Sequence, residues 1–238
     1  MPPLTLDAAV DLTRTGDVWL FRGRTAADRA IQLSTNSPVN HVGMSVVLED
    51  MPPLMWHAEL GRSLPDVWAG THHRGVQLHV LRDAVLTWGR RYGQQAWLRQ
   101  LHHPDGGLSR EQEDALLRTV ARLDGTPFPS TTRLASRWLL ARRRPERGTS
   151  AGGARRSRWG RVPRRRRDAP DDKPAAPAQL ETAFCAEVVA ASYHAMRLLP
   201  DERGPSWYDP GRFWSGDGLP LLGGAWLGDE IAVEIPPL

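Results

Sequence analysis

Two neighbouring stretches of this chain decide how it is expected to fold. The first is His41-Val42-Gly43-Met44-Ser45-Val46-Val47, and the second, after the break at Pro52-Pro53, is Leu54-Met55-Trp56-His57-Ala58-Glu59-Leu60. Both are short, apolar and bounded by turn residues, which is typical of β-strands. Side chains alternate between the two faces of a strand, so Leu54, Trp56 and Ala58 share one face of the second stretch. Met55, His57 and Glu59 share the other face.

Similar patterns elsewhere in the chain predict further strands and helices. A capping box formed by Ser109 and Gln112 marks the start of the clearest helix, and Thr182 is expected to cap the last one. The predicted elements are strands at 17–21, 42–48, 54–60, 76–81, 95–101 and 230–235, and helices at 25–33, 109–125, 131–141 and 182–196. Because strands and helices are grouped more than alternated, the sequence favours an α+β fold with an antiparallel sheet packed against helices.

One segment differs in composition from everything around it. Residues 142–179 are rich in Arg, Gly and Pro and almost free of apolar side chains, which is typical of a disordered insertion. We therefore expect one domain built from residues 1–141 and 180–238, interrupted by this insertion. From Arg142 to Arg167 there are twelve arginines and a single acid, Glu146, so the segment carries +11. Since the whole chain carries +4, the remainder carries −7.

The composition limits the function classes. No apolar run approaches the roughly 20 residues of a transmembrane helix, and no signal peptide is visible, so a cytoplasmic protein is expected. Two interpretations of the segment Arg142 to Arg167 stay open. It is a solvated loop, or it is an arm that binds a polyanion or anionic lipid and brings the protein to a membrane.

Metal and cofactor sites are not indicated. The single cysteine excludes a disulfide framework and a cysteine zinc cluster. The pairs His72-His73 and His102-His103 resemble metal ligands, but adjacent residues on a strand point to opposite faces. No carboxylate stands near either pair at ligand spacing, so we expect exposed loop residues, with no metal and no cofactor.

Cys185 is the first residue that points to chemistry. It stands at the start of the predicted helix 182–196, where free backbone N–H groups stabilise a thiolate and lower the thiol pKa. The same N–H groups can bind an oxyanion once the sulfur attacks a carbonyl. The alternative is a lone buried thiol that acts as a small hydrophobic side chain.

His41 is the second such residue. A histidine at the entrance of a strand can act as a general base near neutral pH. His57 and Glu59 lie on one face of the next strand, and either can hold the His41 imidazole through a hydrogen bond. The alternative for both is a solvated strand face.

Taken together, these segments resemble a known family. Gly16 to Phe21, Thr35 to Gly43, and Phe184 to Val189 with Tyr193 look like the circularly permuted NlpC-type papain-like amidases, the YiiX/YaeF-like group. In that family the histidine strand precedes the nucleophile helix, as His41 precedes Cys185 here. A Gly-Thr-Pro-Phe turn at 125–128 and the late segment 207–213 also stand where the family has comparable motifs.

The resemblance implies a permuted papain-like fold and a thiol hydrolase of amide, ester or thioester bonds, or an acyltransferase. Cys185 would be the nucleophile, His41 the base and His57 the orienting residue, with Glu59 as second choice. The substrate would be a small acylated or peptide-like molecule. The family usually has Ser after the nucleophile, where this chain has Ala186. The alternative function is an inactive papain-like binding protein tethered through its Arg-rich arm.

Overall fold

A seven-stranded sheet forms the centre of the computed structural model, which describes residues 2–23, 37–59, 61, 63–127 and 185–237. The order of its strands is β1-β9-β6-β2-β3-β4-β5. The strands are β1 Leu4–Thr5, β2 Val18–Arg22, β3 His41–Val46, β4 Leu54–Glu59, β5 Gly75–Val80, β6 Gln95–Arg99 and β9 Ile231–Glu234. A small second sheet pairs β7 (Leu101–His102) with β8 (Trp226–Leu227).

Strand pairing in the main sheet is antiparallel with one exception. β2 pairs with β3, β3 with β4 and β4 with β5 in antiparallel register, with Met44 opposite Trp56 and His57 opposite Gln77. The exception is β1, which runs parallel to β9. The prediction of an antiparallel sheet is therefore wrong at this edge. The two chain ends meet there, and β1 enters the sheet in the same direction as β9.

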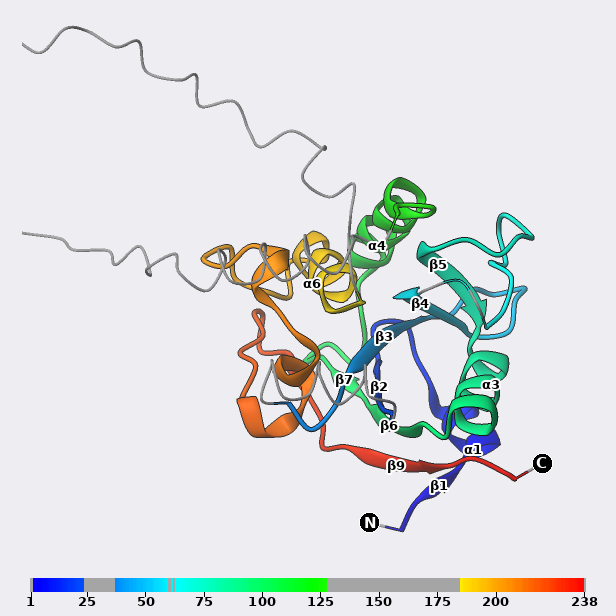
Figure 1. Cartoon of the computed structure of the whole chain (residues 1–238). Coiled ribbons are helices and arrows are strands. Elements are labelled where there is room, and N and C mark those ends of the chain that lie inside the picture. The colour runs from blue at the N-terminus through cyan, green and yellow to red at the C-terminus, as the bar shows by residue number, and fades with distance from the viewer. Residues whose placement is uncertain (1, 24–36, 60, 62, 128–184, 238) are drawn as a thin grey trace, which may run out of the picture.

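Helices cover both faces of this sheet. They are α1 Leu6–Leu12, α3 Leu81–Tyr92, α4 Arg110–Leu123 and α6 Cys185–Ala195, with short 3-10 turns η2 Pro205–Trp207, η3 Pro210–Phe213 and η4 Ser215–Asp217. α6 lies on one side of β3 and β4, with α4 against it, and α3 lies on the other side with α1 (Figure 1). The α+β prediction of a sheet packed against helices is confirmed in this sense.

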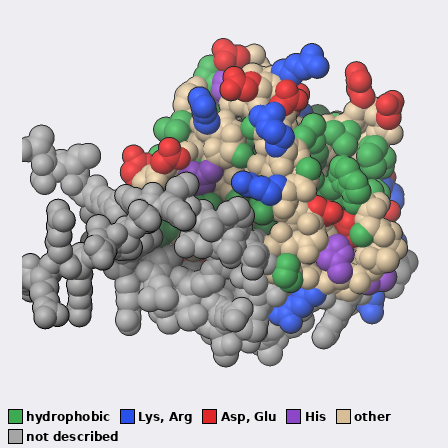
Figure 2. All heavy atoms as spheres, turned by 90° about the horizontal axis from the view of Figure 1, so that it is seen from above, with side chains coloured by type: hydrophobic (Ala, Val, Ile, Leu, Met, Phe, Trp, Pro, Cys, Tyr) green, Lys and Arg blue, Asp and Glu red, His purple; other side chains and the backbone are tan. Residues whose placement is uncertain are grey.

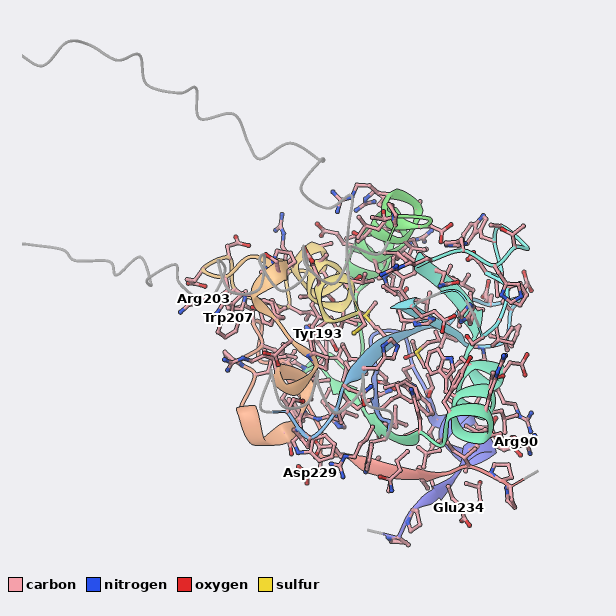
Figure 3. All side chains as sticks on the ribbon, in the orientation of Figure 1. Arg90, Tyr193, Arg203, Trp207, Asp229 and Glu234 are labelled. Carbon is pink, nitrogen blue, oxygen red and sulfur yellow. The ribbon has the colours of Figure 1, made fainter. Side chains whose placement is uncertain are left out.

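The face under α6 is an apolar core. Val42 and Met44 of β3 and Trp56 of β4 pack there against Ala186, Val189 and other buried residues of α6. Two buried polar side chains in this core are paired, because the Trp56 indole N–H donates to Ser192 Oγ at 3.1 Å. Tyr193 donates its hydroxyl to the carbonyl of Gly16 at 2.6 Å, and in Figure 3 it lies inside the molecule, whereas Arg203 and Trp207 lie at its periphery. These two bonds connect α6 to β4 and to the residues that precede β2.

The face under α3 is built differently. Its buried apolar residues include Trp19, Phe21, Met55 and Trp88, and α3 contributes the last of these. The side chains of His57, Gln77 and His79 are fully buried on the same face. As predicted from the alternation in 54–60, the apolar residues Trp56 and Ala58 point to α6, while Met55 and His57 point to α3.

Several predicted elements can be compared directly with the observed ones. Strands 42–48, 54–60, 76–81 and 230–235 match β3, β4, β5 and β9 within two residues at each end. The capping box at the start of α4 is confirmed, because Ser109 Oγ accepts from the Gln112 N–H and Gln112 Oε1 accepts from the Ser109 N–H. The helices predicted at 25–33 and 131–141, the cap Thr182 and the insertion 142–179 lie outside the described residues.

Two surface features concern possible partners. Among the described residues, no helix is long and apolar enough to cross a membrane. On the face seen in Figure 2, Asp and Glu side chains lie interspersed with Arg side chains. The segment Arg142 to Arg167 lies outside the described residues, so its binding to polyanions or anionic lipid stays a prediction.

Candidate active site

Cys185 is the first residue of α6 and is buried, with 7% of its surface exposed. The backbone N–H groups of Val42, Ala186 and Cys185 itself act on the thiol and favour its ionised form. The contact with Val42 is the informative one, because Val42 follows His41 in β3. It places the sulfur near the residue that follows the predicted base, although Cys185 and His41 are 144 positions apart in the sequence.

The expectation of a lowered thiol pKa at Cys185 is wrong. Burial raises the pKa to about 11, because a thiolate in this apolar surrounding loses its hydration, and the nearby carboxylate of Asp209 adds to the effect. The three backbone N–H groups act in the opposite direction, as expected for a helix N-terminus, but they do not outweigh burial. Cys185 is therefore a neutral thiol at pH 7.

His41 opens β3 and is partly buried. Its ring packs against Phe21 and Trp88, with centroid separations of 5.7 Å and 5.2 Å. Its Nε2 lies 3.2 Å from Nδ1 of His57, which is hydrogen-bonding distance. The other ring nitrogen of His41, Nδ1, is thus the one that His57 does not engage.

His57, rather than Glu59, makes the hydrogen bond to His41. The carboxylate of Glu59 instead accepts from the Ser63 hydroxyl at 2.7 Å and 2.8 Å and from the Trp88 side chain. The sequence left both residues open as partners of His41, and the side-chain geometry separates them. Neither lies on a solvated strand face, since His57 is fully buried and Glu59 is mostly buried.

A third histidine, His79 of β5, joins His41 and His57, and the three together form a row of hydrogen-bonded rings, here called the histidine row. Nε2 of His57 lies 3.1 Å from Nδ1 of His79, and His79 is fully buried. The sequence did not indicate a role for His79. The signal was the alternation in 76–81, where Val76 and Leu78 face the α6 core while Gln77 and His79 face α3.

Trp88 of α3 covers this histidine row. Its ring meets those of His41, His57 and His79 edge-on, with centroid separations of 5.2 Å, 4.8 Å and 6.5 Å. Burial lowers the pKa of His41 and of His79 to about 4 and that of His57 well below its usual value. Mutual repulsion between the rings adds to the shift of His41 and His57. All three rings are therefore neutral at pH 7.

The geometry of the row is linear. The four ring nitrogens engaged in the two histidine–histidine hydrogen bonds face each other in pairs and do not converge on a common point. Across residues 2–23, 37–59, 61, 63–127 and 185–237, no group of three or more His, Cys, Asp or Glu side chains is arranged to hold a metal ion.

A pocket lies elsewhere on the molecule. It has a volume of about 690 Å³ and lies between α4 and the second half of α6, at the opposite end of that helix from Cys185. Arg118, Arg122 and Arg203 line it together with His194. The pocket does not include Cys185, His41 or His57, and we do not assign the candidate chemistry to it.

The chain is similar in structure to a solved protein. No protein-family model matches the chain, and no curated protein matches it. A solved structure described as metalloprotein YiiX from Escherichia coli O157:H7, DUF1105, is 19% identical with a TM-score of 0.44. The alignment covers 92% of this chain and 88% of that one.

Proposed function

We propose that this protein is a thiol-dependent hydrolase that cleaves amide bonds of small acylated or peptide-like substrates. Cys185 is the nucleophile, His41 the base and His57 the residue that orients His41. The observation that carries the proposal is that the backbone N–H of Val42, the residue after His41, acts on the Cys185 thiol, while His57 Nδ1 lies 3.2 Å from His41 Nε2. The permuted papain-like fold is part of this proposal, supported by the order of His41 before Cys185 in the sequence.

The reaction needs one proton acceptor and one sulfur nucleophile. The Cys185 thiol passes its proton to Nδ1 of His41 while the sulfur attacks the carbonyl carbon. The protonated His41 then gives that proton to the leaving nitrogen, the C–N bond breaks, and an acyl thioester remains on Cys185. Water attacks the thioester, its proton passes through His41 to the sulfur, and a carboxylic acid leaves. Where another nucleophile replaces water, the same cycle is an acyl transfer.

The raised pKa of Cys185 and the lowered pKa of His41 determine the protonation states in which the reaction starts. With Cys185 near 11 and His41 near 4, thiol and imidazole are both uncharged before substrate binds. The base therefore removes the proton during attack, and no thiolate–imidazolium pair is stored in the resting protein. The N–H groups of Ala186 and Cys185 at the start of α6 are the donors available to the oxyanion.

The proposal makes one demand on geometry. Cys185 packs with Val42 on the α6 face of the sheet, whereas the ring of His41 packs against Trp88 on the α3 face. His41 is the first residue of β3, so its ring stands at the end of the strand. For the reaction to occur, Nδ1 of His41 must face the Cys185 sulfur past the first residue of β3, and the substrate carbonyl must bind at that position.

The direct test is acyl transfer to the one thiol. Wild-type protein is incubated with a panel of amide, ester and thioester acyl donors, and turnover is measured with mass spectrometry of trapped acyl-protein. We expect an adduct of one acyl group at Cys185. Cys185→Ala should lose turnover by about 10³-fold or more, and Cys185→Ser should resemble it. Unchanged hydrolysis in Cys185→Ala would overturn the proposal.

A second candidate is favoured by the burial of Cys185. A thiol that is 7% exposed, with a pKa near 11, also suits a papain-like binding protein that no longer turns over. In that case the segment Arg142 to Arg167 would tether the protein to a polyanion or anionic lipid. Salt-sensitive binding to anionic vesicles that disappears when this segment is deleted, together with an unreactive Cys185, would favour this candidate over the hydrolase.

A further inference from the structure

His41, His57 and His79 are joined by two consecutive hydrogen bonds across β3, β4 and β5, which neighbour one another in the sheet (Figure 1). A neutral imidazole carries one N–H and one bare nitrogen. The central ring, His57, therefore donates through one nitrogen and accepts through the other. Its two hydrogen bonds must run in the same direction, and so the protonation of His79 determines that of His41.

Two arrangements satisfy this rule. In the first, every Nε2 carries a proton: His41 donates to His57, His57 donates to His79, and Nδ1 of His41 is bare. In the second, every Nδ1 carries a proton and both bonds run the other way. Only the first leaves His41 able to accept a proton at Nδ1, the ring nitrogen that His57 does not engage.

The environment at the far end favours the first arrangement. Nε2 of His79 is buried and has no hydrogen-bond partner of normal geometry among the described residues. The acceptor that acts on the His79 ring is the backbone carbonyl of Leu64, which cannot donate, and the carboxylate of Asp66 adds negative potential. Because Nδ1 of His79 already faces His57, Nε2 is the ring nitrogen left for this carbonyl, and a proton there is stabilised whereas a second lone pair is not.

We propose that His79 is a positioning residue of the candidate site: through His57, it holds His41 in the tautomer whose Nδ1 is bare. This inference rests on the proposed function, since that tautomer matters only if Nδ1 takes the proton of Cys185. It also adds a fourth residue to the Cys185, His41 and His57 set. When His41 becomes protonated, its Nε2 proton can move to His57, and the His57 Nε2 proton to His79, where Asp66 stabilises the charge.

Two substitutions separate the role of His79 from simple packing. Asn is the conservative variant, because its Oδ1 can take the place of Nδ1 and accept from His57. Leu removes the acceptor and leaves the Nε2–H of His57 without a partner. Other charged or titratable groups acting on His79 are Asp66, His72 and His73, and both variants keep them. Thermal unfolding of both variants reports whether they fold.

The tautomers are measured directly by nitrogen NMR of ¹⁵N-histidine-labelled protein at pH 7, because bare and protonated ring nitrogens differ widely in chemical shift. Wild type and His79→Asn should show a bare Nδ1 and a protonated Nε2 at His41. His79→Leu should show a mixture of tautomers and about tenfold slower alkylation of Cys185 at neutral pH. A wild-type His41 protonated at Nδ1, or a His79→Leu spectrum identical to wild type, would overturn the inference.

This measurement is separable from the proposed function. The tautomer at His41 is read without any substrate and is expected to persist in Cys185→Ala. If the tautomers follow the prediction but Cys185 never forms an acyl adduct, the hydrolase proposal fails while the role of His79 stands. If Cys185 is acylated and His79→Leu changes neither spectrum nor rate, His79 only packs, and the inference fails alone.

Discussion

The two faces of the central sheet are built on different chemistry. Under α6, buried apolar side chains pack tightly, and polar groups such as Trp56 and Ser192 pair with each other. Under α3, a row of three histidines is buried beneath Trp88, with Nε2 of His79 unpartnered in normal geometry among the described residues. Burying polar side chains such as these imidazoles costs free energy unless they are hydrogen-bonded. The α6 face thus has the apolar packing of a structural core, whereas the α3 face has the buried polar side chains that are typical of a functional site.

The start of β3 is where these two faces meet. Cys185 comes to it from α6, held by the Val42 N–H, and His41 comes to it from the α3 face, held by His57. Neither face contains both groups. The candidate chemistry therefore depends on the end of one strand, to which each face contributes one reacting group.

The largest effect is expected from removing the cover of the histidine row. Trp88→Ala should lower the free energy of unfolding by about 3–5 kcal/mol, because a large buried ring is deleted from contact with Phe21 and three histidines. Chemical denaturation measures this. Trp68→Ala is the matched control, since Trp68 is 65% exposed, and it should change stability by less than about 1 kcal/mol. Equal effects would contradict the description of the α3 face.

The next effect is a loss of stability in acid. The pKa values of His41 and His79 are about 4 in the folded protein and near 6.5 when unfolded, so the unfolded chain binds more protons between these values. Stability is therefore full above pH 6.5 and falls as the pH is lowered toward 4. We expect a fall of order 3 kcal/mol between pH 6.5 and 5, measured by denaturant titration.

Asp17, which directly precedes β2, acts with the opposite sign. Its carboxylate accepts from the N–H groups of Arg14 and Leu101, and burial raises its pKa from 3.8 to about 6. The folded state therefore holds this proton more tightly, and acidification from pH 6 to 3.8 stabilises the protein. Asp17→Asn should make the acid destabilisation steeper. A protein that is more stable at pH 5 than at pH 7 would contradict the histidine account.

The third prediction separates His57 from Glu59. His57→Ala should slow the reaction of Cys185 at neutral pH by about ten- to a hundredfold, because His41 loses the ring that orients it. Glu59→Ala is the matched control on the same strand face, and it should change the rate by less than threefold, since Glu59 bonds Ser63 and Trp88 instead. A larger loss in the Glu59 variant would reverse the assignment.

The smallest effect concerns the spacing of β3 and β4. A Cβ at Gly43 would meet the sulfur of Met55 and would stand 3.3 Å from Cβ of His57. Gly43→Ala should therefore cost about 1–2 kcal/mol and disturb His57, because the sulfur can move only partly in a packed core. Gly107→Ala, in open space, should be neutral. Circular dichroism melting curves compare the two.

The sequence predicted the sheet better than the helices. Alternation in 54–60 correctly divided Trp56 from His57, and Ser109 with Gln112 marked α4. Helix α3 was not predicted, although Leu81, Ala84, Val85 and Trp88 stand at helical spacing. Gly89 interrupts that pattern. Glycine stands there because of a tertiary contact, since a Cβ at this position would overlap the side chain of Ile235.

For the candidate site, the sequence likewise indicates residues but not the contacts between them. His41, His57 and Cys185 could be named from strand and helix starts, but the contact between Val42 and Cys185 depends on how α6 docks. The raised pKa of Cys185 likewise follows from burial, which no local pattern reports. His79 was hidden because its role appears only when β5 lies beside β4.

The most direct test of the account is the rate of Cys185 alkylation by a small neutral reagent against pH, in wild type and in His41→Ala. A neutral thiol beside a neutral base reacts at a rate that is constant between their two pKa values. Wild type should thus show a plateau from about pH 5 to 9. His41→Ala should lose the plateau and rise about tenfold per pH unit, as thiolate alone does. A wild-type profile that rises tenfold per unit throughout, unchanged in His41→Ala, would contradict the claim that the two faces form one site.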